Sequence, residues 1–212
     1  MKEEKSMEPK TPKSSRTRRK ILAAARTTFS EKGFAGTTIE DIASLAGVNR
    51  AHPYAFFADK EDLYNATMAE CLEVYKSVLE ACPIDDRDSP VTKVRKIVES
   101  ILKMGTEYQE CTDLFRWDTA SGNMAFADAY RSGGNFAFSS LVDAIEEGVE
   151  HEIFRPDLDV IDASMTVIMI CFQYFLRREV IESLRQQTLE EYFAQPGIKE
   201  QIVNYCLRVL IR

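Results

Sequence analysis

The segment from residue 37 to residue 50, TTIEDIASLAGVNR, restricts the fold of this chain more than any other. Thr38 can cap a helix, and Asp41 three residues later completes a capping-box pattern. Apolar residues follow at helical spacing as far as Gly47, which can adopt the positive φ that a tight turn needs. Asn49 is a favourable N-cap for a second short helix. This order of elements indicates a helix-turn-helix, although an ordinary helical hairpin would show the same local pattern.

A helix on each side of this segment would complete a compact unit. We expect the first helix over residues 16–32, ended by Gly33, and a later one from a cap at Asp59 to about Ala81. The expected core of the unit consists of Phe29, Ile39, Ile42, Tyr54 and Phe57. The predicted domains are a disordered basic tail over residues 1–14, a helix-turn-helix domain over 15–60 and a larger helical domain over 61–212.

The remainder of the chain also has the spacing of helices, so the predicted fold class is all-α. Ser89 and Pro90 supply an N-cap and a first-turn proline for a helix that should reach Glu110. Further helices are expected over 113–119, 123–150, 157–185 and 188–211, with bends or breaks at Gly133-Gly134 and Pro196-Gly197. The longest apolar run, residues 163–176, is too short to span a bilayer, so we expect a buried helix and no membrane segment.

Charge is distributed unevenly along the chain. Residues 1–60 carry 12 Lys or Arg and 7 Asp or Glu, whereas residues 61–212 carry 15 and 27, so a net charge of +5 precedes one of −12. A basic N-terminal region on an acidic body is typical of a protein that faces nucleic acid with that region, although a merely solvated tail would give the same composition. The positive charge is densest at Lys10, Lys13, Arg16, Arg18, Arg19, Lys20 and Arg26.

No pattern in the sequence indicates catalysis or a bound cofactor. The five cysteines form no C-x-x-C pair, and the only histidines are His52 and His151, so we expect reduced thiols and no metal site. No glycine-rich phosphate loop and no signal peptide is evident. These observations predict a cytoplasmic protein that has no cofactor and is not an enzyme. A helical enzyme or a ligand-binding protein that does not bind DNA is the alternative.

The stretch from Arg19 to Leu63 resembles the N-terminal domain of the TetR (tetracycline repressor) family of transcriptional regulators. The shared features are I-L-x-A-A, F-x-E-K-G-F, T-T-x-x-D-I-A, A-G-V and Y-x-x-F-x-x-K-E-x-L, with their spacings preserved. The resemblance implies that the third helix enters the major groove of double-stranded DNA. It implies contacts to base edges or nearby phosphates from Asn49, Arg50, Ala51 and His52, and phosphate contacts from Thr38, Tyr54 and Lys60. For Tyr54 the alternative is a packing role, and for Lys60 a solvated charge.

Pro53 departs from the family pattern, because relatives usually carry a pair such as Thr-Leu where this chain has His52-Pro53. Counted from a cap at Asn49, Pro53 is the fourth residue of the third helix. A proline there removes the first intrahelical hydrogen bond, and its ring crowds the carbonyl of Asn49. We therefore predict that the third helix begins late or is kinked.

Residues 90–180 are rich in aromatic and methionine side chains, most of which must form core. Large rings and flexible methionines between helices also describe an adaptable pocket for a small apolar or amphipathic molecule, as the family resemblance implies. The residues predicted to line that pocket are Phe115, Trp117, Phe126, Tyr130, Met169, Phe172 and Gln173.

The last two helices are expected to form a homodimer interface, as they do in the family. The predicted stripes are Val160, Ser164, Val167, Ile168 and Cys171 on one helix, and Ile198, Ile202, Tyr205, Leu207, Val209 and Leu210 on the other. The resulting hypothesis is a dimeric repressor that binds a palindromic operator and is released by a small-molecule effector. An activator, or a repressor without a ligand, remains an alternative.

Overall fold

The computed structural model describes residues 12–122, 125–129, 131 and 136–211, and in these ranges the chain is helical, with no strand. The predicted all-α class is therefore confirmed. The elements are α1 (Pro12–Gly36), α2 (Ile39–Leu45), the 3₁₀ turn η1 (Pro53–Ala55), α3 (Lys60–Glu80), α4 (Pro90–Glu107), α5 (Gln109–Ser121), α6 (Ala125–Ala129), α7 (Phe136–Glu150), α8 (Val160–Leu176), α9 (Arg178–Arg185), α10 (Leu189–Ala194) and α11 (Ile198–Leu210).

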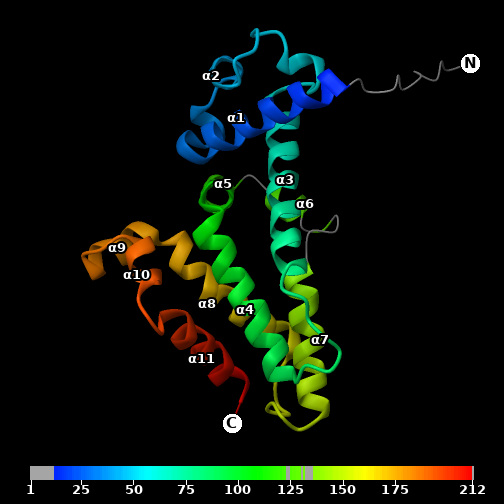
Figure 1. The fold of residues 1–212 in the computed structure, drawn as a ribbon, viewed down its shortest axis with the longest axis vertical. Coiled ribbons are helices and arrows are strands. Elements are labelled where there is room, and N and C mark those ends of the chain that lie inside the picture. Colours follow the sequence, from blue (N-terminus) through cyan, green and yellow to red (C-terminus); the bar gives the residue numbers. More distant parts are fainter. Residues whose placement is uncertain (1–11, 123–124, 130, 132–135, 212) are drawn as a thin grey trace, which may run out of the picture.

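The molecule is elongated, with α1 and α2 at one end (Figure 1). Helix α3 runs from that end toward the middle, where α5 lies between α1 and the rest of the chain. Helices α4, α7, α8 and α11 form the other end around a core that includes Ile97, Leu141, Val167 and Val203, while α9 and α10 project to one side. The fold therefore separates a small N-terminal unit from a larger helical body.

The predicted helix starts are confirmed where a side chain caps the helix. Thr38 Oγ1 accepts the N–H of Asp41 at 3.1 Å, and the Asp41 carboxylate accepts the N–H of Thr38 at 3.1 Å, so the capping box of α2 is complete. Asp59 caps α3 and Ser89 caps α4 in the same way, by accepting the N–H three residues later. Each cap fixes where a helix begins because it satisfies a backbone donor that has no partner inside the helix.

Helix lengths agree less well with the sequence. Helix α1 begins at Pro12, inside the expected tail, whose residues 1–11 lie outside the described residues, as do Gly133 and Gly134. The expected helix over 90–110 ends at Glu107, and Tyr108, with φ −123° and ψ 52°, turns the chain into α5. The expected helix over 157–185 is divided into α8 and α9, which meet at Arg177 with a bend of 69°. The predicted break at Pro196-Gly197 is confirmed, because it separates α10 from α11. No single described helix is long and apolar enough to cross a bilayer; α8 and α9 meet that test only as a bent pair.

The N-terminal core contains Phe29, Ile39, Ile42 and Phe57 as predicted, but the placement of Tyr54 in it was wrong. Tyr54 is 57% exposed because it lies on the outer side of η1. Tyr64 of α3 is buried instead and meets the ring of Phe29 edge-on, with 4.9 Å between the ring centres. The same core includes Cys111, Leu114 and Phe115 of α5, so α5 helps to enclose the N-terminal unit.

Most residues of the predicted dimer stripes face the core of their own chain, so the placement of those residues on an outer face was wrong, except for Tyr205, which is exposed. Those buried are Ser164, Val167, Cys171, Ile202, Leu207 and Leu210, while Val160, Ile168, Ile198 and Val209 are partly buried against the same core. The apolar side chains that α8 exposes are Ile161, Met165 and Met169, one turn from each other, and α11 exposes Tyr205. The helical period of the sequence was correct, but it did not indicate which of two apolar faces pointed outward.

Gly33 is a point of close approach between α1 and α5. It has φ 68° and ψ 177°, a conformation that is essentially restricted to glycine, and it interrupts the helical path of α1. A Cβ on Gly33 would lie 2.9 Å from two carbons of the Trp117 indole. The backbone conformation and the approach of Trp117 therefore both require a residue without a side chain.

The Gly33→Ala variant should lose about 3 kcal/mol or more of unfolding free energy, because backbone strain and a steric clash each cost about 1–3 kcal/mol. Gly122→Ala is the matched control. Gly122 also has a positive φ, 63°, but nothing lies within 4 Å of the position that its Cβ would occupy. The Gly122→Ala variant should lose only about 1 kcal/mol of unfolding free energy. Urea unfolding measures both losses, and equal losses would contradict the proposed contact between α1 and α5.

Candidate functional site

The turn after α2 presents the predicted base-contacting residues to solvent. Asn49, Arg50, Ala51 and His52 are all exposed. The Asn49 side chain accepts the N–H of Ala51 at 3.0 Å, which fixes the start of the turn. This end of the molecule therefore has an outward-facing turn with a cation, an imidazole and, in Tyr54, a phenol.

The third helix was predicted to begin late or to be kinked at Pro53, and regular structure does begin only at this residue. The carbonyl of Asn49 accepts the N–H of His52, three residues later, at 2.8 Å. The only regular element in this region is η1, a single 3₁₀ turn that starts at Pro53. Because proline has no N–H, the α-helical bond from residue 53 to Asn49 cannot form, and the chain makes tighter turns instead. The exposed surface at this place is consequently a turn, not a helix of several turns.

Arg50 is held by an ion pair with Glu40 of α2. Both side chains are largely exposed, so the pair contributes little to stability. It does restrict the guanidinium to the side of the turn that faces α2. A base or a phosphate that binds Arg50 must share it with Glu40 or displace Glu40.

Lys60 is engaged inside the N-terminal unit. Its ammonium donates to the carbonyl of Phe34 at 2.9 Å and to that of Thr37 at 3.1 Å, and it lies 4.3 Å from the centre of the Phe34 ring. It is thus not the solvated charge that was the alternative for this residue, and a phosphate contact from it stays a prediction. The Thr38 hydroxyl is likewise occupied, because it donates to the Asp41 carboxylate at 2.8 Å.

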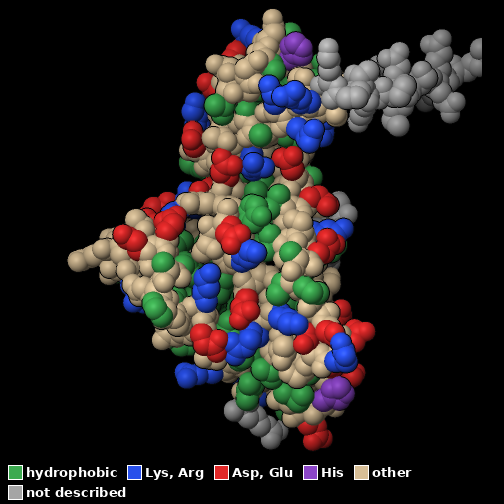
Figure 2. All heavy atoms as spheres, in the orientation of Figure 1, with side chains coloured by type: hydrophobic (Ala, Val, Ile, Leu, Met, Phe, Trp, Pro, Cys, Tyr) green, Lys and Arg blue, Asp and Glu red, His purple; other side chains and the backbone are tan. Residues whose placement is uncertain are grey.

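Basic side chains of α1 extend the exposed surface beside the turn. Arg16, Arg19 and Lys20 are exposed, and Lys and Arg side chains together with a histidine occupy this end of the molecule (Figure 2). Arg18 lies over the Phe57 ring at 5.3 Å. Arg26 faces the other way, toward Glu110 and Glu70, at 2.9 and 3.5 Å. The positive charge of the N-terminal unit is therefore divided between an outer surface and an inner contact.

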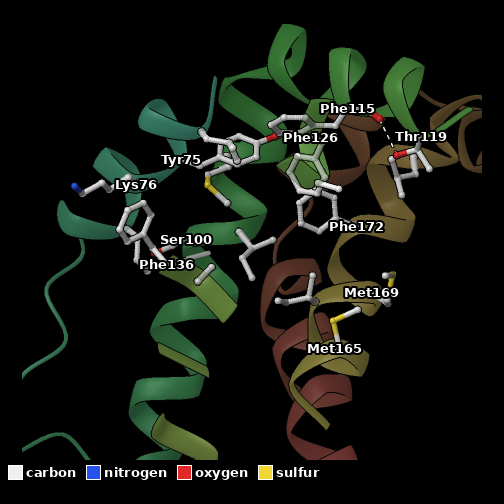
Figure 3. Close-up of a pocket in the computed structure, with 18 of the residues that line it drawn as sticks. Tyr75, Lys76, Ser100, Phe115, Thr119, Phe126, Phe136, Met165, Met169 and Phe172 are labelled. Carbon is white, nitrogen blue, oxygen red and sulfur yellow. Dashed lines mark hydrogen bonds between the residues drawn. The ribbon is translucent and has the colours of Figure 1, made fainter. Parts of the chain in front are cut away.

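A cavity of about 470 Å³ lies in the larger unit between α3, α4, α5, α6, α7 and α8 (Figure 3). Four of the seven predicted residues line it: Phe115, Phe126, Met169 and Phe172. Its other described lining residues are Leu72, Tyr75, Lys76, Leu79, Ser100, Ile101, Met104, Thr119, Ala127, Arg131, Phe136, Ala137, Met165, Ile168 and Leu176. Its size and its aromatic and methionine wall are typical of a site for a small organic molecule.

Two of the remaining predicted lining residues do not join the cavity, and the third lies outside the described residues. Gln173 lies on the exposed face of α8, Trp117 packs on Gly33, and Tyr130 lies outside the described residues. The sequence-based prediction missed the α3 wall, because it considered only residues 90–180. The spacing of Leu72, Tyr75 and Leu79 on α3 would have revealed an apolar face there. In the described residues no cluster of three metal-ligating side chains occurs.

Helix α5 connects the cavity to the N-terminal unit. It contributes Phe115 and Thr119 to the cavity wall. On another face, its Trp117 Nε1 donates to the Ser30 carbonyl at 3.0 Å. Seven residues before Trp117 on the same helix, Glu110 accepts hydrogen bonds from Arg26 Nε at 2.9 Å and Thr27 Oγ1 at 2.7 Å. A displacement of α5 by a molecule in the cavity would therefore act directly on α1.

Asp118 of α5 adds a buried polar contact to this connection. Its carboxylate accepts the Tyr64 hydroxyl at 3.2 Å and the N–H of Phe126 at 3.1 Å, and so joins α3, α5 and α6. Burial raises the pKa of Asp118, while the hydrogen bonds from Phe126 and Tyr64 oppose that rise. The carboxylate is thus held by the fold and is not presented to the cavity, whose lining does not include it.

Two family models match the chain. "Bacterial regulatory proteins, tetR family" matches residues 21–67. "Tetracyclin repressor-like, C-terminal domain" matches residues 90–205, which is more than half of the chain. The first match contains the exposed turn and the second contains most of the cavity wall.

Individual relatives agree with these matches. The HTH-type transcriptional regulator RutR of Escherichia coli is 33% identical over 102 residues, so the match spans 48% of this chain and about half, 47%, of RutR. The HTH-type transcriptional repressor NicS of Pseudomonas putida is 26% identical over 199 residues and 93% of both chains.

Solved structures show the same fold at lower identity. A transcriptional regulator from Saccharomonospora viridis in complex with choline superposes with a TM-score of 0.73 at 16% identity, over 93% of this chain and 99% of that one. FadR from Bacillus subtilis in complex with stearoyl-CoA superposes with a TM-score of 0.70 at 14% identity, over 89% and 96%.

The contacts of Lys60 lead to a stability prediction. Lys60→Met should lower the unfolding free energy by about 2 kcal/mol, because two charge-assisted hydrogen bonds to backbone carbonyls are lost. Lys32→Met is the matched control, since Lys32 makes only an exposed ion pair with Asp41 at 3.6 Å. Its cost should be below about 1 kcal/mol. If urea unfolding gives the same stability for both variants, the ammonium of Lys60 does not hold these carbonyls.

Proposed function

The chain belongs to the TetR family of bacterial regulatory proteins, and from that premise we propose that it is a cytoplasmic repressor that binds a palindromic operator as a homodimer and is released by a small apolar or amphipathic effector. The observation that carries the proposal is the exposed turn from Asn49 to His52, held by the capped helix α2 and flanked by the basic surface of α1. The family consists of transcription regulators, not enzymes.

The proposed DNA contacts follow from exposure and charge. Arg50 can form two hydrogen bonds with guanine, His52 can contact a neighbouring base, and Tyr54 can reach a phosphate. Because Pro53 reduces the third helix to one turn, few residues can reach base edges. Phosphate contacts from the exposed residues Arg16, Arg19 and Lys20 would therefore supply much of the affinity, which should fall steeply as salt is added.

The proposed release mechanism uses the position of α5. A molecule in the cavity would contact Phe115 and Thr119, and α5 would pass its displacement to α1 through Trp117 and Glu110. A coupling of about 1–3 kcal/mol is usual for such linked sites. The structures of two neighbours were determined with choline and with stearoyl-CoA, which supports a ligand in this fold without identifying the one bound here.

The proposed dimer uses the outer faces of α8 and α11. Ile161, Met165 and Met169 form an apolar stripe that the chain itself does not cover, and Tyr205 lies exposed on α11. A second copy is the proposed occupant, because a palindromic operator requires two identical turns related by a two-fold axis. Packing α8 and α11 of both copies together would give a four-helix bundle.

Selection of binding sites from a palindromic library by the purified protein tests the function. An enriched sequence at moderate salt supports the proposal, and the absence of any enriched sequence contradicts it. A reporter gene placed behind the selected site then distinguishes a repressor from an activator, because only a repressor lowers expression.

Arg50→Ala should reduce the affinity for the selected site by about tenfold to a hundredfold and relax the preference at one base pair, since a base-specific arginine contact is worth about 1–3 kcal/mol. Arg87→Ala is the matched control, because Arg87 is an exposed arginine in the segment between α3 and α4, far from the turn in sequence. Binding measured by fluorescence anisotropy should not change in this control. An unchanged base preference in Arg50→Ala would show that another residue reads the base.

Ile161→Glu should weaken the dimer at least tenfold, because a carboxylate without a partner would be buried in the interface. Ile161 is chosen because it lies on the exposed stripe but does not line the cavity. Leu184→Glu, at an exposed leucine of α9, should leave the dimer intact. Sedimentation velocity at several concentrations measures both variants. If Ile161→Glu leaves the dimer unchanged, the interface lies on another surface of the chain.

A further inference from the structure

The wall of the cavity is almost entirely apolar, and this limits the chemistry of what it can bind (Figure 3). Of the described lining residues, only Tyr75, Lys76, Ser100, Thr119 and Arg131 carry a polar group, and none is an aspartate or a glutamate. The charge that a ligand can carry therefore depends on which hydrogen-bond donors, acceptors and charges of these five residues are not already used within the protein.

Two of the three hydroxyl groups, those of Ser100 and Thr119, already use their hydrogen atoms within the protein. Ser100 Oγ donates to the Lys96 carbonyl at 2.9 Å, and Thr119 Oγ1 donates to the Phe115 carbonyl at 2.9 Å. The Tyr75 hydroxyl is hydrogen-bonded to Thr112 at 3.1 Å. A hydroxyl that has donated its hydrogen still has lone pairs and can accept one. The Ser100 and Thr119 hydroxyls therefore offer acceptors to a ligand but have no hydrogen left to donate to an anion.

The two cations of the wall are each paired with a carboxylate outside it. The ammonium of Lys76 lies 3.9 Å from Glu80 on the same helix and 4.7 Å from the centre of the Phe136 ring. Arg131 is paired with Asp128. An anionic ligand would compete with these carboxylates for the two cations, whereas a cationic ligand would find no carboxylate in the described wall.

We propose that the effector of this cavity is an uncharged, predominantly apolar molecule whose polar group, where it has one, donates a hydrogen bond. The inference rests on the proposed function, in which this cavity receives the effector. A cation transferred from water to this wall would lose its hydration without finding a carboxylate, and an anion would compete with Glu80 and Asp128 for Lys76 and Arg131, so a charge of either sign opposes binding. A hydroxyl or N–H group could instead be accepted by Ser100 or Thr119, while the rings and methionines cover the rest of the molecule.

Two fluorescent dyes that share one ring system test the proposal directly. N-phenyl-1-naphthylamine is neutral, and 8-anilino-1-naphthalenesulfonate has the same rings with an added sulfonate. Titrated into the full-length protein at pH 8, the neutral dye should bind at least tenfold more tightly. Equal binding, or tighter binding of the sulfonate, would overturn the proposal.

Variants that fill the cavity establish where the dye binds. Ala137→Phe places a ring in the cavity and should abolish binding of the neutral dye, whereas Ala194→Phe on the exposed face of α10 should not. Ile168→Trp fills the same cavity from α8 and provides a second test if Ala137→Phe does not fold. If folded cavity-filling variants bind the dye normally, the cavity is not the binding site and the proposal is overturned.

Displacement of the neutral dye by ligands with one common tail tests the charge more generally. The competitors are 1-decanol, decanoic acid and decyltrimethylammonium, with the alcohol expected to act at the lowest concentration. The apparent affinity of decanoic acid should rise about tenfold for each unit that the pH falls from 8 to 6, because only the protonated acid is neutral. Stronger displacement by the carboxylate or the ammonium would overturn the proposal.

These experiments need no DNA, so they separate this inference from the proposed function. A charged ligand that binds best overturns the inference, while operator selection still decides whether the protein is a regulator. If no dye and no competitor binds the wild-type protein, both the inference and the ligand-release part of the proposed function are overturned.

Discussion

The contact between α1 and α5 determines how the two units of this protein meet. At one point the Trp117 indole packs on Gly33, where the backbone conformation and the space both exclude a side chain. At another, Glu110 accepts hydrogen bonds from Arg26 and Thr27. The N-terminal core is incomplete without Leu114 and Phe115 of the same helix. The exposed turn is thus supported by a helix that also forms the wall of the cavity, and any movement of that wall has a short route to the DNA-facing surface.

The DNA-facing end shows how one residue changes the form of a motif without removing it. The capping box of α2 and the exposed turn are present, yet Pro53 leaves only one 3₁₀ turn where a helix was expected. Elsewhere in the unit, the Lys60 ammonium joins the start of α3 to the carbonyls of Phe34 in α1 and of Thr37 just after it. The unit therefore keeps its shape through contacts around the turn, and the turn itself contributes only its exposed side chains.

Much of the fold followed from local chemistry, and much of the site did not. The caps at Thr38, Asp59 and Ser89 were predictable because each is satisfied by a backbone N–H three residues away. Trp117 was expected in the cavity and lies on Gly33 instead, since an aromatic ring on an amphipathic helix can belong to either side of it. The dimer stripe was misplaced for the same reason, because α8 is apolar on more than one face.

The sequence by itself determined the helical class, the start of each capped helix, the family and the late start of the third helix, because these depend on residues close together in the chain. The tertiary structure alone decided which apolar faces became core, cavity or surface, and it paired Arg26 with Glu110 and Lys60 with the carbonyls near Phe34. Those outcomes join residues that are distant in sequence, and they depend on how helices cross. Helical spacing specifies that a face is apolar, but only packing in three dimensions specifies what that face contacts.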